Sequence, residues 1–166
     1  MTGSQVIDAK EDRHKLVVEY KDTLQPGDFY KNLKQRGIRA VQLIPHIEFN
    51  DRGELTAASV TTELWGQFLI ALFECWVRTD ISRISIELFD VTLQKWCGNE
   101  SQQPQRGCCQ ECDWYLLCPH AGDGQPDKVL CAGYQAFYSH SAPHMRVMRD
   151  LIKQHRSPVE LMTMLW

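Results

Sequence analysis

The sequence has no long apolar run and no strong excess of either charge. Its 166 residues include 18 Lys and Arg against 21 Asp and Glu, a formal net charge of −3. So weak a field would not draw the chain to nucleic acid or to a membrane surface. No stretch of about 18 apolar residues without charges occurs, which predicts no transmembrane helix. The first 20 residues contain charges but no apolar segment, so we expect no secretory signal and a cytoplasmic protein.

Motifs of common enzyme classes are also missing. There is no G-x-G-x-x-G, no G-x-x-x-x-G-K-[ST] and no G-x-S-x-G in the sequence, which argues against nucleotide binding through such loops and against a serine-hydrolase elbow. No pairing of a nucleophile with a base is recognisable. The sequence therefore gives no support for an independent enzyme.

Hydrophobic residues make up 43% of the chain, enough for a real core. Apolar patterns predict an α/β fold in residues 14–97, with a short, mainly parallel sheet and right-handed crossovers. Strands are expected at 16–20, 38–44 and 83–89. Helices are expected from Pro26 to a C-cap at Gly37, over 59–80 and around 91–96. Residues 98–107 read as a polar linker, so a second unit is expected over 98–166.

The helix over 59–80 should pack an apolar stripe on one face of the sheet. That stripe consists of Trp65, Phe68, Leu69, Leu72, Phe73 and Trp76. We expect the other sheet face, with Gln42 and Glu87 among its members, to be covered by Tyr134, Phe137 and Met145 to Met148. An open apolar face would otherwise promote aggregation.

Pro143 predicts a break between two C-terminal helices, at 132–140 and 143–154, because proline fits the first turn of a helix. His140 and His144 are then expected in surface or capping roles. Ser157 and Pro158 predict the start of a last short helix. Basic residues of these helices form a stripe that is the one weak argument for an acidic partner: Arg146, Arg149, Lys153, His155 and Arg156.

Cysteine is the exception to this ordinary composition, with seven in the chain. Cys109-x2-Cys112-x5-Cys118-x12-Cys131 places four thiols within 23 residues, a spacing suited to a metal centre. The thiols alone do not separate zinc from an iron–sulfur cluster, and free thiols are the alternative. Cys108, adjacent to Cys109, is taken as a spare. Cys75 is expected in the core. Cys97 is expected at the end of a short helix, either as a leftover ligand or without a role.

Several motifs together resemble the anaerobic sulfatase-maturating enzymes, which are radical S-adenosylmethionine proteins with a SPASM-type C-terminal extension. The resemblance rests on these segments: Pro26-x2-Phe29-Tyr30, Gln42-Leu43-Ile44-Pro45, Val60-Thr61-x3-Trp65-Gly66, Leu88-Phe89-Asp90, Cys131-x-Gly133-Tyr134-x2-Phe137-x2-His140 and Arg156-Ser157-Pro158. It implies a partial (β/α) barrel fragment followed by a shortened, Cys-rich SPASM-like segment and C-terminal helices. It also implies that Cys109, Cys112, Cys118 and Cys131 match the ligands of the family's second auxiliary cluster.

The chain departs from the family at the residues that initiate its chemistry. Radical chemistry there needs a Cys-x3-Cys-x2-Cys, which is absent from this sequence. The first strands of the barrel are not found either, and Gly122 stands where the family has a cysteine of its first auxiliary cluster. The resemblance therefore implies a non-catalytic remnant that binds one 4Fe–4S cluster but not S-adenosylmethionine.

Two functions follow as hypotheses. The first is a cluster-binding protein associated with sulfatase maturation, with a sulfatase or an intact maturase as partner. The second is a small zinc-binding interaction or regulatory module. In either case a barrel fragment exposes a strand edge, which predicts a homodimer or another covering element there.

Overall fold

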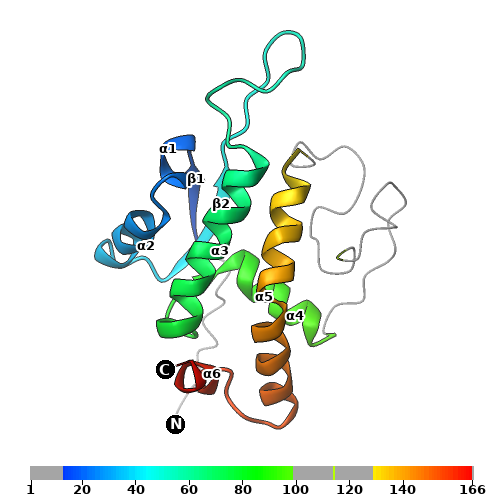
Figure 1. The fold of residues 1–166 in the computed structure, drawn as a ribbon. Helices are drawn as coiled ribbons and strands as arrows, with labels where there is room; N and C mark the ends of the chain where they lie inside the picture. Colours follow the sequence, from blue (N-terminus) through cyan, green and yellow to red (C-terminus); the bar gives the residue numbers. More distant parts are fainter. Residues whose placement is uncertain (1–12, 99–113, 115–128, 166) are drawn as a thin grey trace, which may run out of the picture.

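The computed structural model describes residues 13–98, 114 and 129–165. Along the chain its strands and helices are β1 (His14–Val18), α1 (Tyr20–Thr23), α2 (Pro26–Gln35), β2 (Ala40–Pro45), α3 (Thr62–Thr79), β3 (Ser85–Ile86), α4 (Glu87–Trp96), α5 (Cys131–Lys153) and α6 (Glu160–Met164). Figure 1 shows α3 beside the sheet and α5 alongside α3.

The sheet is parallel and its strands lie in the order β1-β2-β3, as the sequence predicts. Leu16 pairs with Leu43, and Val41 pairs with Ile86. Side chains alternate along a strand. One face therefore carries Val18, Val41 and Ile86, which are fully buried. Gln42, which alternates with them, lies on the opposite face and is half-buried.

The third strand is much shorter than the sequence predicts. A strand over 83–89 is wrong, because β3 ends at Ile86 and α4 begins at Glu87. Phe89 and Thr92 are buried three and six residues after Ile86, a helical spacing that the short alternating pattern concealed. Phe89 packs edge-on against Phe73, with ring centroids 5.3 Å apart. This contact turns the chain toward α3.

The longest apolar pattern forms helix α3 as expected, with slightly tighter bounds. Thr61 caps its start by accepting a hydrogen bond from Leu64 N–H at 3.3 Å. The predicted stripe is buried along its whole length. At the other end Trp76 donates from Nε1 to the Ile84 carbonyl at 2.7 Å, which fixes the turn into β3.

Helix α5 is continuous, so the predicted break at Pro143 is wrong. Proline removes one backbone donor and leaves the carbonyl four residues earlier without its helical partner. Pro143 and Ser139, the residue that carries that carbonyl, are both exposed. Met145 and Met148 are fully buried beyond the proline, and their packing holds the helix together. His140 and His144 therefore lie on one unbroken helix, contrary to expectation.

The packing position of α5 also differs from the prediction. Tyr134 and Phe137 are buried, as predicted, but their partners are helices. Tyr134 lies edge-on to Trp65, and Phe137 stacks on Phe89 with centroids 5.2 Å apart. Helix α5 packs on α3, α4 and α6, so its apolar side adds a layer outside α3 rather than covering the second sheet face.

Two smaller features complete the fold. Residues 46–60 leave the carboxyl end of β2 as a projecting hairpin, closed by a bridge between Phe49 and Leu55 (Figure 1). The last helix begins at Glu160, later than predicted, although Ser157 Oγ does accept a hydrogen bond from Val159 N–H. Within the described ranges no helix is both long and apolar enough to cross a bilayer.

Candidate functional site

The predicted metal ligands fall in two parts of the chain. Cys109, Cys112 and Cys118 lie outside the described residues. Cys131 is the first residue of α5 and is half-buried. Among residues 13–98, 114 and 129–165, no three His, Cys, Asp or Glu side chains converge on a point that could hold a metal. The structure thus positions one of the four candidate ligands.

The backbone next to Cys131 is held by a close crossing of α3 and α5. Gly133 N–H donates to Thr62 Oγ1 at 2.8 Å. A Cβ on Gly133 would lie 2.5 Å from the Thr62 carbonyl oxygen, and one on Gly66 would lie 3.0 Å from the Gly133 Cα. The approach therefore requires glycine at position 133 and leaves little room for a larger residue at position 66. The Cys131-x-Gly133-Tyr134 segment is therefore fixed to the core two residues from the thiol.

Trp114 is the described residue between the candidate cysteines, and it packs on the same helix. In the sequence it lies between Cys112 and Cys118, and in the structure it is partly buried against the core. Its ring centroid is 6.3 Å from that of Tyr138. Tyr138 follows Cys131 by seven residues, about two helical turns, so both lie on one face of α5. The sequence pattern did not single out Trp114.

The two other described cysteines are both half-buried. Cys75 packs against the core from α3, and Cys97 is the C-cap of α4, as expected. Burial raises the pKa of the Cys75 thiol, and the carboxylates of Asp80 and Glu74 raise it further. Burial also raises the pKa of Cys97 despite nearby Arg149 and Lys153. Both thiols are therefore protonated at neutral pH and are poor nucleophiles.

A buried carboxylate at the end of α3 is held by three donors. Tyr30 Oη donates to Asp80 Oδ2 at 2.5 Å, Thr79 Oγ1 donates at 2.8 Å, and Lys34 Nζ lies 3.2 Å away. Burial alone would raise the pKa of Asp80, but these hydrogen bonds and the Lys34 charge lower it overall. The same contact and burial raise the pKa of Tyr30. The cluster joins α2 to α3, and sequence patterns gave no sign of it.

A second polar cluster lies at the amino ends of the strands. Arg13 donates to the Val41 carbonyl at 3.3 Å and to Ser85 Oγ at 2.9 Å, and Ser85 Oγ donates to Asp90. Burial raises the pKa of Asp90, although the Ser85 hydrogen bond and the Arg13 charge oppose the rise. Arg13 thus spans all three strands on the sheet face opposite to the core.

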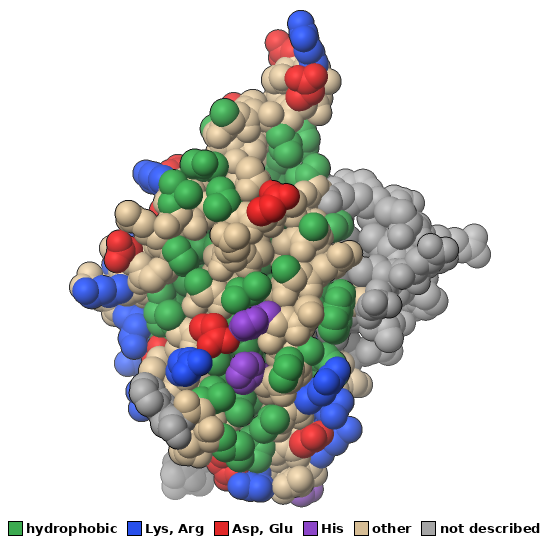
Figure 2. All heavy atoms as spheres, viewed as in Figure 1, with side chains coloured by type: hydrophobic (Ala, Val, Ile, Leu, Met, Phe, Trp, Pro, Cys, Tyr) green, Lys and Arg blue, Asp and Glu red, His purple; other side chains and the backbone are tan. Residues whose placement is uncertain are grey.

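Helices α3 and α5 also share an exposed ionic contact. His140 Nε2 lies 2.6 Å from Glu74 Oε1, while Arg78 binds the other carboxylate oxygen at 3.1 Å. Burial would raise the pKa of Glu74, but its bonds to His140 and Arg78 lower it overall. His144 instead lies edge-on to Phe73, and burial lowers its pKa. Figure 2 shows acidic and basic side chains interspersed on this face, with no broad patch of one sign.

Comparison with known proteins gives relatives at two levels of similarity. No family model matches the chain. The Uncharacterized protein YidF of Escherichia coli (strain K12) is 82% identical over 99% of both chains. The Serine-type anaerobic sulfatase-maturating enzyme of Bacteroides thetaiotaomicron is 22% identical over 82% of this chain and 53% of its own length.

Solved structures give the same picture at the level of fold. Native anSMEcpe with bound AdoMet matches with a TM-score of 0.62 at 14% identity, over 82% of this chain and 56% of that chain. The form with bound AdoMet and a Cp18Cys peptide matches with a TM-score of 0.65, at 15% identity. The chain therefore shares part of the maturase fold and spans about half the length of the maturases it matches.

Proposed function

The chain belongs to the YidF family, and on that premise we propose that it is a non-catalytic homologue of the anaerobic sulfatase maturases. In this proposal it keeps one cysteine-ligated 4Fe–4S cluster and acts in sulfatase maturation through binding. The relation to the maturases supports the choice of pathway. The absence of a Cys-x3-Cys-x2-Cys within the 166 residues supports a role without radical chemistry.

The contact between Trp114 and Tyr138 is the observation that carries the cluster proposal. Trp114 is separated by only one residue from Cys112 and by three from Cys118. Its ring packs on the helix that begins with Cys131. Four thiolates are a sufficient ligand set for a cubane cluster, and when bound it would supply stabilisation that this polar segment lacks.

The crossing of α3 and α5 adds a second support. A ligand must be held in place for a cluster to bind tightly. The hydrogen bond from Gly133 to Thr62 and the contact with Gly66 hold the first turn of α5. In this proposal Cys131 is the ligand on the folded core, and the three remaining cysteines would complete the set.

Metal content tests this proposal directly. Protein purified and reconstituted without oxygen should contain about four iron atoms per chain, with the visible absorption of a cubane cluster. Cys131→Ala should lose most of that iron, whereas Cys75→Ala should retain it, because Cys75 lies apart in α3 with a protonated thiol. Equal iron in both variants, or no iron in any of them, would contradict the proposal.

A zinc-binding interaction module is the second candidate function. It would take about one zinc per chain through the same four cysteines. Its contact face would be the basic stripe over residues 146–156, but three of those side chains are engaged within the molecule. Arg146 and Arg149 lie over the Trp96 ring at 5.5 and 5.7 Å, and Arg156 pairs with Glu160. We therefore place this candidate second.

The partner proposal has its own test. We propose that the cluster-loaded protein binds a sulfatase or an intact maturase. Titration calorimetry with each purified protein, under anaerobic conditions, should show binding to at least one of them. The absence of binding to both would contradict the proposed role in maturation but leave the metal result unaffected.

A further inference from the structure

Strand β1 lies at one edge of the sheet, and its backbone shows which groups point outward. His46 N–H donates to the Val18 carbonyl at 2.9 Å, so Val18 directs its backbone groups toward β2. Along a strand, the backbone N–H and C=O groups of successive residues point alternately to one side and to the other. Lys15 and Val17 therefore direct their N–H and C=O groups away from the sheet. The Val17 side chain is 54% exposed.

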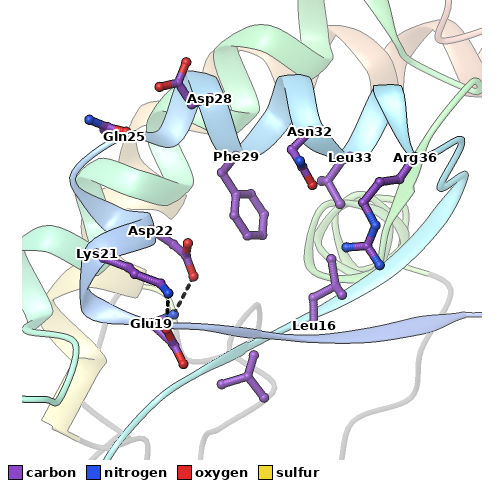
Figure 3. Close-up of a pocket in the computed structure, with 11 residues that line it drawn as sticks. Leu16, Glu19, Lys21, Asp22, Gln25, Asp28, Phe29, Asn32, Leu33 and Arg36 are labelled. Atoms are coloured by element: carbon purple, nitrogen blue, oxygen red, sulfur yellow. Dashed lines mark hydrogen bonds and ion pairs between the residues drawn. The ribbon is translucent and has the colours of Figure 1, made fainter.

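A groove runs along this edge, between β1 and helix α2. It encloses about 550 Å³, and Phe29, Leu33 and Leu16 form its apolar middle. Figure 3 shows Leu16 beneath Asn32 and Leu33, with Glu19, Asp22 and Asp28 grouped toward one end and Arg36 at the other. Lys21 lies at the same end as these carboxylates and pairs with Glu19 at 3.1 Å. The groove thus has an end with three carboxylates and one lysine, acidic overall, and a basic end at Arg36, separated by an apolar centre.

Three residues of α2 that line the groove show the same order of charge, from acidic to basic. Asp28, Asn32 and Arg36 are spaced four residues apart, which places them on one face of the helix, and all three line the groove. Within the described residues neither Asp28 nor Arg36 makes an ion pair. A two-fold rotation about Asn32 would bring the acidic end of one copy onto the basic end of another.

We propose that this edge is the interface of a two-fold symmetric homodimer. The β1 strands of two copies pair antiparallel about Leu16, so that Lys15 of one copy opposes Val17 of the other. These are the two residues with outward backbone groups, and each such pair exchanges two hydrogen bonds. The α2 helices lie antiparallel above the joined strands, with Asp28 of each copy beside Arg36 of the other.

The charged residues on either side of the apolar part of β1 also agree with a two-fold axis at Leu16. Its sequence runs from Lys15 through three apolar residues to Glu19. With Leu16 at the axis, Glu19 of the second copy comes diagonal to Lys15, within reach of that long side chain. The Glu19 backbone is already used, since its N–H donates to Asp22 Oδ2 and its carbonyl accepts from Asp22 N–H. Pairing therefore stays within residues 15–17, consistent with the Leu16 register. This match between an edge and its own rotated copy favours a second chain over an unrelated peptide.

The experiment is sedimentation equilibrium of the full chain in reducing buffer over a range of concentrations. We expect a reversible dimer that weakens as salt is added, because ion pairs rim the interface. Asp28→Arg and Arg36→Asp should each weaken the dimer roughly tenfold or more by placing like charges together. Mixing the two variants in equal amounts should restore dimerisation, since each supplies the charge that the other lacks. The double variant D28R/R36D should also dimerise.

Val17→Pro tests the strand pairing separately. It removes an outward N–H and leaves the ladder to β2 intact, because Val17 does not face β2. The variant should be folded by circular dichroism yet monomeric. The proposal is supported if the mixture of Asp28→Arg and Arg36→Asp dimerises and Val17→Pro is monomeric. A monomeric wild-type chain, a dimer indifferent to these charges, or a dimer that survives Val17→Pro would overturn it. None of these outcomes depends on whether the cysteines bind metal.

Discussion

Replacement of Gly133 by alanine tests the helix crossing on which the candidate cysteine site depends. The new Cβ would lie 2.5 Å from the Thr62 carbonyl oxygen and 3.0 Å from the Gly66 nitrogen. Both are backbone atoms, so α3 and α5 must separate by at least about 0.5 Å to relieve the overlap. That shift also stretches the hydrogen bond from Gly133 N–H to Thr62 Oγ1.

The expected cost combines three effects. Overpacking costs about 1–3 kcal/mol, and loss of the hydrogen bond costs about 1 kcal/mol. Higher helix propensity returns up to about 1 kcal/mol. We therefore expect Gly133→Ala to lower the free energy of unfolding by about 1–3 kcal/mol. Urea unfolding followed by circular dichroism should show this as a midpoint lower by about 1 M.

Gly27→Ala is the matched control for this experiment. Gly27 lies in the first turn of α2, and no atom lies within 4 Å of a Cβ built there. The same chemical change should be neutral or stabilising by up to about 1 kcal/mol. If Gly133→Ala were as stable as Gly27→Ala, the crossing would not be tight and our account of how Cys131 is held would be refuted.

Four further outcomes are expected. Reduced, reconstituted protein should form no 5′-deoxyadenosine from S-adenosylmethionine, measured by chromatography against an intact maturase as positive control; product formation would contradict a non-catalytic role. Trp114→Ala should lower the iron content of reconstituted protein with little loss of helix by circular dichroism; unchanged iron would show that the Tyr138 contact does not support the centre. The lowered pKa of Asp80 means that its contribution to stability is present above the unfolded pKa of about 3.9 and is lost as pH falls through the folded value. Asp80→Asn should therefore destabilise the protein in urea at pH 7, with a difference from wild type that shrinks below about pH 4. The pKa of Asp90 is raised instead, so the contribution of this residue to stability is present at low pH and is lost as pH rises through the folded pKa. Asp90→Asn should consequently cost less at pH 7 than Asp80→Asn, and equal costs would contradict the assignment.

Local periodicity predicted the elements that are long or have a single apolar face. The stripe of α3 and the parallel order of the strands follow from side-chain spacing and crossover length, which are properties of neighbouring residues. Short patterns were ambiguous for the same reason. Residues 83–89 fit an alternating strand, and only the packing of Phe89 on Phe73 shows that a helix begins at Glu87.

The candidate cysteines and the family resemblance were found from the sequence by itself, because residue type and spacing along the chain are properties of the sequence. The tertiary structure decided what surrounds Cys131. The glycine crossing with α3, the contact of Trp114 with Tyr138, and the continuation of α5 past Pro143 all join residues that no local pattern relates. Proline breaks an isolated helix, but burial of Met145 and Met148 outweighs one lost hydrogen bond whose acceptor belongs to an exposed residue.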